Sequence, residues 1–280
     1  MKRYLWIFAV LPFLWSCIAE DRSACPQPRG VSVRMSVCPD PMTAVTHAAD
    51  EEAIRDLNLY LLDADRNVVL HRYQSSPTLR FECLPGDYLL RIAANMGRDT
   101  GDSPAWENLA VTHADDYDTL PMAYEGEVSI PSSDETVTLP TVEVQRVVAK
   151  VTYNISVAPD AGDIRLHSVQ PVNLPARMPV FDPGLRAAEY TAGEIVGSSS
   201  QTLTGTFYML PNLQGEVPSI ADQRDKGPAN APADATFLRI RALRGSKVLD
   251  YYIYPGGNNT SNFDIRANTH YRLDIMIRGD

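Results

Sequence analysis

Five histidines and four cysteines are the side chains of this sequence with the widest chemical repertoire. The sequence contains no Gly-x-Ser-x-Gly nucleophile elbow, no His-Glu-x-x-His zinc helix and no Gly-rich phosphate loop. The members of a catalytic triad need not be close in the chain, so a triad assembled by the fold stays open. We expect a protein that is not an enzyme, takes no small-molecule substrate and uses no cofactor. The histidines are His47, His71, His113, His167 and His270.

Cys17 follows a segment that is typical of a secretory signal. Two basic residues open the chain, residues 4–14 are almost wholly apolar, and the small residue Ser16 precedes the cysteine. The apolar run is shorter than the roughly 20 residues of a membrane-spanning helix. This order predicts a signal peptide over residues 1–16, cleaved between Ser16 and Cys17.

The letters LWSC, residues 14–17, resemble the lipobox of bacterial lipoproteins, in which the cysteine is acylated after cleavage. Each buried methylene of an acyl chain contributes about 0.8 kcal/mol, so two or more chains, palmitate among them, hold a protein durably on a membrane. The AED motif at residues 19–21 resembles the acidic signal that sends lipoproteins of Bacteroidales-type bacteria to the outer cell surface. We therefore predict lipidation at Cys17 and a lipidated tether over residues 17–30.

Three further cysteines, Cys25, Cys38 and Cys83, remain in the exported chain. An exported protein can form disulfides, and three cysteines allow one bridge with one thiol left over. The sequence leaves the pairing open. No Cys-x-x-Cys pair accompanies the scattered histidines, so no zinc site is expected.

Two acidic motifs have the composition of a cation site. DADRN, residues 63–67, starts like a calcium loop, but Val68 and Gln74 occupy the positions that require Gly and Glu. A hairpin turn is the better interpretation, because Asp and Asn favour turns. DDYD, residues 115–118, is interpreted as a solvated acidic loop. No metal is expected.

The charge balance excludes some partners. The chain has 280 residues and a net charge of −10, and removing the two positive charges of residues 1–16 takes the net charge to −12. An acidic body argues against nucleic acid and against binding of anionic membranes through charge. The 21 prolines indicate loops and edge strands rather than helices.

Period-two alternation of apolar residues predicts an all-β protein made of antiparallel sandwiches. Residues 141–157 are too long for one strand, so we divide them near Arg146, where we also place a domain boundary. The predicted domains are residues 31–146 and 147–280. Alternation is clearest in residues 31–37, 57–63, 84–95 and 270–277. Long loops are expected over 171–197 and 214–234, and a helix over 49–57.

Several stretches resemble the fimbrillin-A-associated anchor family, the lipoproteins at the base of Bacteroidales-type fimbriae. They are residues 17–26, 83–95, 120–130, 142–151, 207–215 and 254–277, of which the last two are the most specific. The resemblance implies two tandem transthyretin-like (Greek-key) sandwiches, lipid attachment to the outer membrane, and anchoring and length control of a fimbrial shaft. In the last stretch, residues 256–259 (GGNN) suit positive backbone angles in a turn.

Shaft-forming relatives assemble by strand exchange, after a protease removes an N-terminal segment and a neighbour's strand fills the groove. Here the chain stops three residues after Ile277, and no appended donor strand is expected. Cutting at Arg29 or Arg34 would release the body from the membrane. We expect the first strand, residues 31–37, to stay in place, so that the subunit remains tethered and ends the polymer.

Two alternatives remain. The first is a shaft or tip subunit, an adhesin, of the same superfamily. The second is a cell-surface lipoprotein that binds glycans, which would require exposed aromatic side chains. Outside the signal segment the only tryptophan is Trp106, and Tyr251, Tyr252 and Tyr254 are the tyrosines that could stack on sugars.

Overall fold

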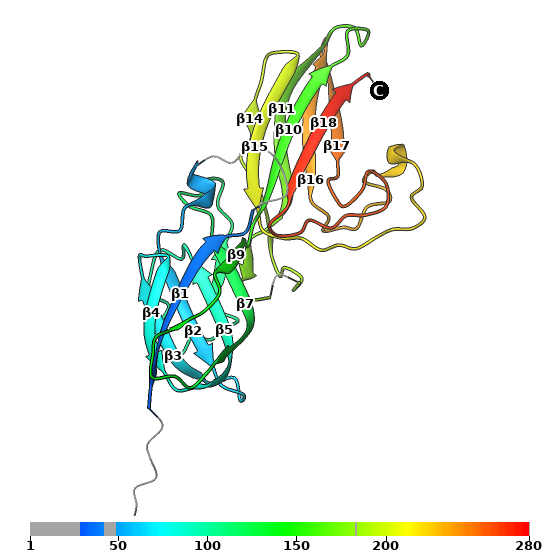
Figure 1. Cartoon of the computed structure of the whole chain (residues 1–280). Coiled ribbons are helices and arrows are strands. Elements are labelled where there is room, and N and C mark those ends of the chain that lie inside the picture. Colours follow the sequence, from blue (N-terminus) through cyan, green and yellow to red (C-terminus); the bar gives the residue numbers. More distant parts are fainter. Residues whose placement is uncertain (1–28, 42–48, 183, 280) are drawn as a thin grey trace, which may run out of the picture.

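Two stacks of β-strands, placed end to end, make up the chain (Figure 1). The computed structural model describes residues 29–41, 49–182 and 184–279. In the first half, one eight-stranded sheet has the order β3-β2-β5-β7-β9-β1-β4, with β8 beside β1. Its strands are β1 (Val31–Pro39), β2 (Leu57–Leu62), β3 (Val68–Gln74), β4 (Thr78–Cys83), β5 (Gly86–Ala94), β7 (Met122–Ile130), β8 (Val137–Thr138) and β9 (Val142–Arg146).

The second half consists of two facing sheets, β15-β10-β18 and β13-β11-β16-β17, with β14 beside β11. Apolar side chains of β10, β11, β16, β17 and β18 form the core between them. The strands are β10 (Ala149–Val157), β11 (Ile164–Pro175), β13 (Tyr190–Ala192), β14 (Val196–Gly197), β15 (Thr202–Met209), β16 (Phe237–Arg244), β17 (Lys247–Ile253) and β18 (His270–Ile277).

The all-β prediction is confirmed, and so is the division near Arg146, where β9 ends shortly before β10 begins. Not every pairing is antiparallel, however. β10 runs parallel to β18 along its whole length, and β1 runs parallel to β8 and β9. Alternation in a sequence identifies a strand but carries no information about the direction of its neighbour.

The strand β2 is buried on both faces, although alternation predicts only one buried face. The segment that follows β5 covers its second face. Asn58 Nδ2 donates to the carbonyl oxygen of Arg98 at 3.0 Å, and Tyr60 OH donates to that of Gly101 at 3.0 Å. This cover comes from about 40 residues away in the chain, so the local pattern could not reveal it.

Two predicted irregular segments need correction. The expected loop over 171–197 is only partly irregular, because β11 continues to Pro175 past a bulge at Asn173 (φ 56°), and short strands β12 (Arg177–Pro179), β13 and β14 interrupt the rest. The expected helix over 49–57 is reduced to a four-residue 3-10 helix, η1 (Ala49–Glu52). Asp56 instead accepts hydrogen bonds from the N–H groups of residues 96 and 97, each at 3.0 Å, which fixes a non-helical path.

The predicted loop over 214–234 is confirmed as a segment without β-strands that contains the short helix η2 (Gln223–Asp225). The domain boundary at residue 146 stays a prediction. Met178 and Val180, from the second half of the sequence, pack into the core of the first half. The short strand β12 also pairs with β6 (Ala110–Thr112).

A buried carboxylate joins the two halves. Glu51 Oε1 accepts hydrogen bonds from Lys150 Nζ at 2.7 Å and from Tyr208 OH at 2.6 Å. Burial alone would raise the pKa of Glu51, but the hydrogen bonds from Lys150 and Tyr208 and the positive charges of Lys150 and Arg146 outweigh it, so the pKa lies below its ordinary value. Glu51 therefore stays ionised and holds β10 and β15 against η1.

Arg146 extends this contact. Arg146 is 1% exposed, and its guanidinium donates to the carbonyl oxygens of Glu51 at 3.1 Å and Asp40 at 2.9 Å, and to Asn268 Oδ1 at 3.3 Å. Asn268 Nδ2 in turn donates to Asp40 Oδ2 at 2.8 Å. The last residue of β9 thus ties the end of β1 to the turn before β18.

We predict that Glu51→Gln destabilises the protein by about 3–5 kcal/mol, because it leaves the buried ammonium of Lys150 without its counter-ion. The folded-state pKa of Glu51 lies below 4.5, so its contribution to stability is present above pH 4.5 and is lost as the pH falls through the folded pKa. Chemical unfolding of wild type and variant across pH 3–7 measures this difference. Glu82→Gln, which changes an exposed acid away from this cluster, is the control, and an equal effect of both substitutions would contradict the prediction.

The glycines at 256 and 257 have a different role from the one that the sequence predicts. Neither has a positive φ angle. A Cβ atom on Gly256 would overlap the backbone carbonyl oxygen of Asn262, and one on Gly257 would lie 2.9 Å from Asn262 Oδ1. Lys226 holds the same loop, since its buried Nζ donates to the carbonyl oxygens of Asn258 and Asn262, both at 2.7 Å. The glycines are required by this close approach.

We predict that Gly256→Ala lowers the free energy of unfolding by about 1–3 kcal/mol or more, because the backbone at Asn262 must shift. Gly227→Ala is the matched control in the same region, since a Cβ there meets nothing within 4 Å. Thermal unfolding of both variants measures the difference. Similar melting temperatures for the two would show that the loop accommodates the methyl group.

Candidate functional site

The first strand, β1, lies inside the sheet rather than at its edge. It pairs antiparallel with β4 over residues 31–36 and parallel with β9 over residues 37–39, and β8 joins it at Val33 and Arg34. The four side chains on its inner face are at most 4% exposed; they are Val31, Val33, Met35 and Val37. The predicted alternation of this strand is confirmed. Both edges of β1 and its inner face are therefore bound to the rest of the first half.

Two arginines mark where a protease could separate β1 from the preceding chain. Arg29 is exposed and precedes β1 outside any strand. Arg34 also has an exposed side chain, but its backbone pairs with Arg80 of β4, and its carbonyl oxygen accepts a hydrogen bond from the N–H of Leu139 at 2.9 Å. Cleavage after Arg34 therefore requires that the sheet open first.

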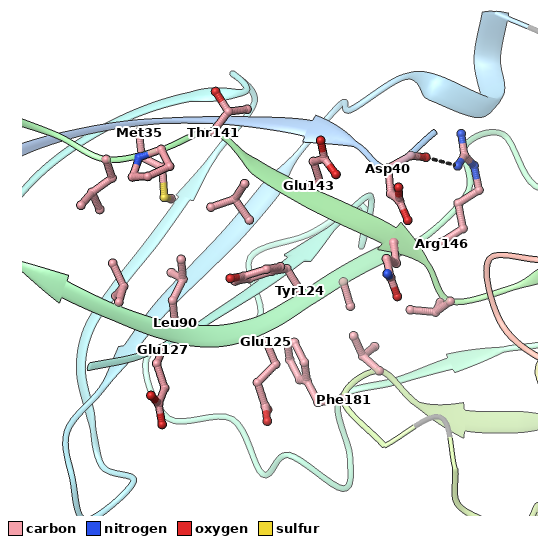
Figure 2. A pocket seen from close by; sticks show the side chains of 18 of the residues that line it. Met35, Asp40, Leu90, Tyr124, Glu125, Glu127, Thr141, Glu143, Arg146 and Phe181 are labelled. Carbon is pink, nitrogen blue, oxygen red and sulfur yellow. Dashed lines mark hydrogen bonds between the residues drawn. The ribbon is translucent and has the colours of Figure 1, made fainter. Parts of the chain in front are cut away.

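A cleft of about 710 Å³ lies beside β1, between β7 and β9 (Figure 2). The two strands pair only at Met122 with Arg146 and at Ala123 with Gln145, and then diverge. Tyr124 lies between the strands, whereas Glu125 and Glu127 point outwards from β7. The floor is apolar and includes Met35, Leu90, Val128, Leu139 and Val142.

The acids beside this cleft are Glu125, Glu127, Glu143 and Asp40. Glu125 accepts a hydrogen bond from Arg91 Nε at 2.6 Å. The sequence analysis did not single these residues out. The available signal was the alternation of acids in YEGEV, residues 124–128, which places Glu125 and Glu127 on one face of a strand.

Part of the cysteine predictions cannot be compared with the structure, because Ser16, Cys17 and Cys25 lie outside the described residues. Within the described ranges, Cys38 and Cys83 form no disulfide. Cys83 is opposite Val31 at the start of β1, whereas Cys38 lies near its end, so these two thiols are not in bonding reach of each other. Burial raises the pKa of both thiols. Lipidation, signal cleavage and a bridge to Cys25 stay predictions.

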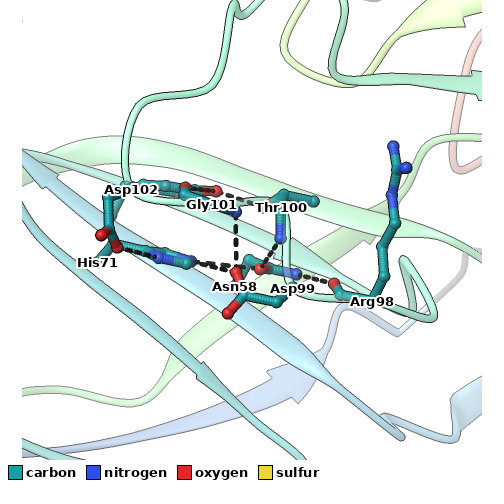
Figure 3. Close-up of polar contacts among 8 residues, drawn as sticks. Asn58, His71, Arg98, Asp99, Thr100, Gly101 and Asp102 are labelled. Atoms are coloured by element: carbon teal, nitrogen blue, oxygen red, sulfur yellow. Dashed lines mark hydrogen bonds and ion pairs between the residues drawn. The ribbon is translucent and has the colours of Figure 1, made fainter.

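One histidine lies among acids, as a catalytic histidine would (Figure 3). His71 Nδ1 is 3.0 Å from Asp102 Oδ1, and its Nε2 is 3.3 Å from Asn58 Oδ1. The nearby Thr100 hydroxyl pairs with Tyr60 OH instead of His71, and the rings of His71 and Tyr60 stack at 4.4 Å. No nucleophile contacts the imidazole in the described network. The cluster fastens the segment after β5 across β2 and β3.

The acidic motifs do not form a metal site. Asp63 Oδ1 accepts hydrogen bonds from the N–H groups of Asp65 at 3.0 Å and Asn67 at 2.9 Å, which confirms the hairpin turn between β2 and β3. Across residues 29–41, 49–182 and 184–279, no three His, Cys, Asp or Glu side chains gather to hold a metal ion. No helix in these described ranges is long and apolar enough to span a membrane.

Comparison with known proteins shows the fold. Residues 207–275 match a family model described as a domain of unknown function, DUF4906, over less than half of the chain. No curated protein matches the sequence.

Among solved structures, the tip fimbrial protein Mfa3 from Porphyromonas gingivalis, with a C-terminal truncation, has a TM-score of 0.62 at 15% identity, covering 88% of this chain and 94% of that one. A fimbrilin (FimA) from P. gingivalis W83 has a TM-score of 0.58 at 14% identity, covering 89% and 91%. A fimbrial assembly protein from Parabacteroides distasonis has a TM-score of 0.53 at 12% identity, covering 88% and 91%. The chain shares the fold of these proteins along nearly its whole length.

We predict that brief trypsin digestion cuts after Arg29 and leaves the bond after Arg34 intact, because only the first lies outside the sheet. Mass spectrometry of the digested full chain identifies the new N-terminus. Under denaturing conditions both bonds should be cut, which serves as the control. Equal early cleavage after both arginines would contradict the stable insertion of β1.

Proposed function

We propose that this chain is a fimbrial anchor subunit, attached by lipid on Cys17 to the outer surface of the outer membrane, that fixes a shaft there and limits its length. The observation that carries the proposal is the position of β1, which follows the predicted tether directly and is inserted between β4 and β9 of a sheet. The shared fold with a tip fimbrial protein, a fimbrilin and a fimbrial assembly protein supports it. The partners are fimbrial shaft subunits and the membrane.

The energetics of β1 support a subunit that keeps this strand. Full burial of each of its inner side chains is worth about 1.5–3 kcal/mol, before its hydrogen bonds on both edges are counted. Spontaneous release is therefore costly. As long as β1 stays, its place in the sheet is closed to a strand from another subunit, so growth of a polymer by filling that place stops here.

Cleavage would have different consequences at the two arginines. A cut after Arg29 would remove the tether but leave β1 complete. A cut after Arg34 would remove the first half of β1, including Val31 and Val33, and would expose the core that these side chains cover. The mature N-terminus therefore distinguishes an anchor, which keeps Cys17, from a processed shaft or tip subunit.

In the finer architecture we propose two tandem transthyretin-like (Greek-key) domains, residues 31–146 and 147–280. The separate cores of the two sheet systems support this division. The structural similarity to the tip fimbrial protein Mfa3 supports the alternative that the chain is a tip subunit. The glycan-binding alternative is weakened by Trp106, whose ring packs against Tyr60, Phe181 and the guanidinium of Arg91.

We predict that Cys17→Ser moves the protein out of the envelope fraction and that fimbriae are then shed or altered in length, because the acyl chains are the tether. Mass spectrometry of the mature wild-type N-terminus should show an acylated Cys17. A matched Cys38→Ser variant, which changes a cysteine near the end of β1, should retain envelope attachment. Retention of the Cys17→Ser protein in the envelope, or a mature start after Arg29 or Arg34, would overturn the anchor proposal.

A further inference from the structure

The cleft between β7 and β9 offers an unpaired strand edge. Val147 N–H donates to the carbonyl oxygen of Pro121 at 2.9 Å, so the carbonyl group of Pro121, which has no N–H, faces β9. Along a strand these directions alternate, and the N–H and C=O groups of residues 125, 127 and 129 therefore face the same side. In the described part of the chain, no strand pairs with this edge of β7 beyond Ala123.

The two faces of this edge differ in chemistry. On the inner face, the half-buried side chains of Tyr124 and Val128 line the cleft together with its other apolar residues. On the outer face, Glu125 and Glu127 are exposed, and Glu143 is exposed on the outer side of β9. A strand added to β7 would place alternate side chains next to each face. Those on the inner side would meet apolar groups, and those on the outer side would meet carboxylates.

The two arginines near the cleft already have partners, although the buried Nη2 of Arg146 has no hydrogen-bond partner among the described residues. Arg91 pairs with Glu125, and the Arg146 guanidinium turns away from the cleft towards the carbonyl oxygen of Asp40 (Figure 2). Glu127 and Glu143 are therefore the carboxylates that a bound segment would neutralise. Electrostatic complementarity of this kind selects a partner and fixes its register.

We propose that this cleft binds an extended segment of a partner protein in which apolar residues alternate with lysine or arginine, and that the segment adds a strand to the free edge of β7. Main-chain hydrogen bonds to residues 125, 127 and 129 supply affinity, and the apolar floor and acidic outer face supply selectivity. The place of β1 in the sheet is not involved. The proposal deepens the proposed function by naming a surface for contact with another subunit, yet it requires neither the lipid nor retention of β1.

The test uses the full mature chain in non-ionic detergent and a fluorescein-labelled peptide, acetyl-Lys-Val-Lys-Val-Lys-Val-Lys-amide. Fluorescence anisotropy should show saturable binding that weakens with salt. A peptide with Glu in place of Lys should bind at least about tenfold more weakly, which corresponds to about 1.4 kcal/mol. Absence of saturable binding, or equal binding of the acidic peptide, would overturn the proposal.

Two matched substitutions locate the site. Glu127→Pro removes an N–H group that faces the cleft and leaves the β5 side of β7 unchanged, so it should weaken binding about tenfold or more, whereas Glu127→Gln should weaken it only a few-fold. If Glu127→Pro does not fold, the double variant Glu127→Lys with Glu143→Lys decides, because it should reverse the preference towards the acidic peptide. Glu82→Lys, an exposed acid on β4, is the control and should change neither affinity. An unchanged preference in the double variant would overturn the proposal.

These outcomes are separable from those of the anchor proposal. Peptide binding by the purified chain does not depend on the location of the protein in the cell. Failure of peptide binding would leave lipidation of Cys17 and attachment of fimbriae untouched, and release of Cys17→Ser from the envelope would say nothing about the cleft.

Discussion

The insertion of β1 between β4 and β9 is the constraint on which the rest of the first half depends. Without β1, β4 would have no neighbouring strand in the described part of the sheet, and β9 would keep only its two residue pairs with β7. Val33 and Met35 are 0% and 1% exposed, so loss of their side chains would also leave a cavity in the core. The same strand ends at Pro39, next to Asp40, whose carbonyl oxygen receives Arg146. The position of β1 therefore directly affects the contact between the two halves.

That contact is electrostatic as well as apolar. Glu51 from the first half meets Lys150 and Tyr208 from the second, and its low pKa means that the ion pair persists at neutral pH. Breaking one member of a buried pair is costly, since the remaining charge stays away from water. Together with Met178 and Val180 in the first core, this pair couples the two halves through several independent contacts.

Local patterns predicted the strands but not what covers them. Alternation identified β1, β5 and β18, and the Asp-rich turn before β3 followed from side-chain chemistry. The full burial of β2, the parallel pairing of β10 with β18 and the steric need for Gly256 arise from contacts between distant residues. The cleft was missed for the same reason: Glu125 and Glu127 were visible as alternating acids, but only the fold shows that β9 diverges from them. The lipid site at Cys17 is a prediction from the sequence alone.

The direction of β1 has a mechanical consequence. The strand begins at the end of the first half that is far from the second half and runs towards it (Figure 1). If the proposed lipid tether holds the N-terminal side and a filament is held at the opposite end, drag from flowing liquid would pull along the strand axis. Hydrogen bonds to β4, β8 and β9 then share the load in shear, instead of rupturing one after another as in peeling. Such an arrangement is suited to a joint that must resist sustained traction.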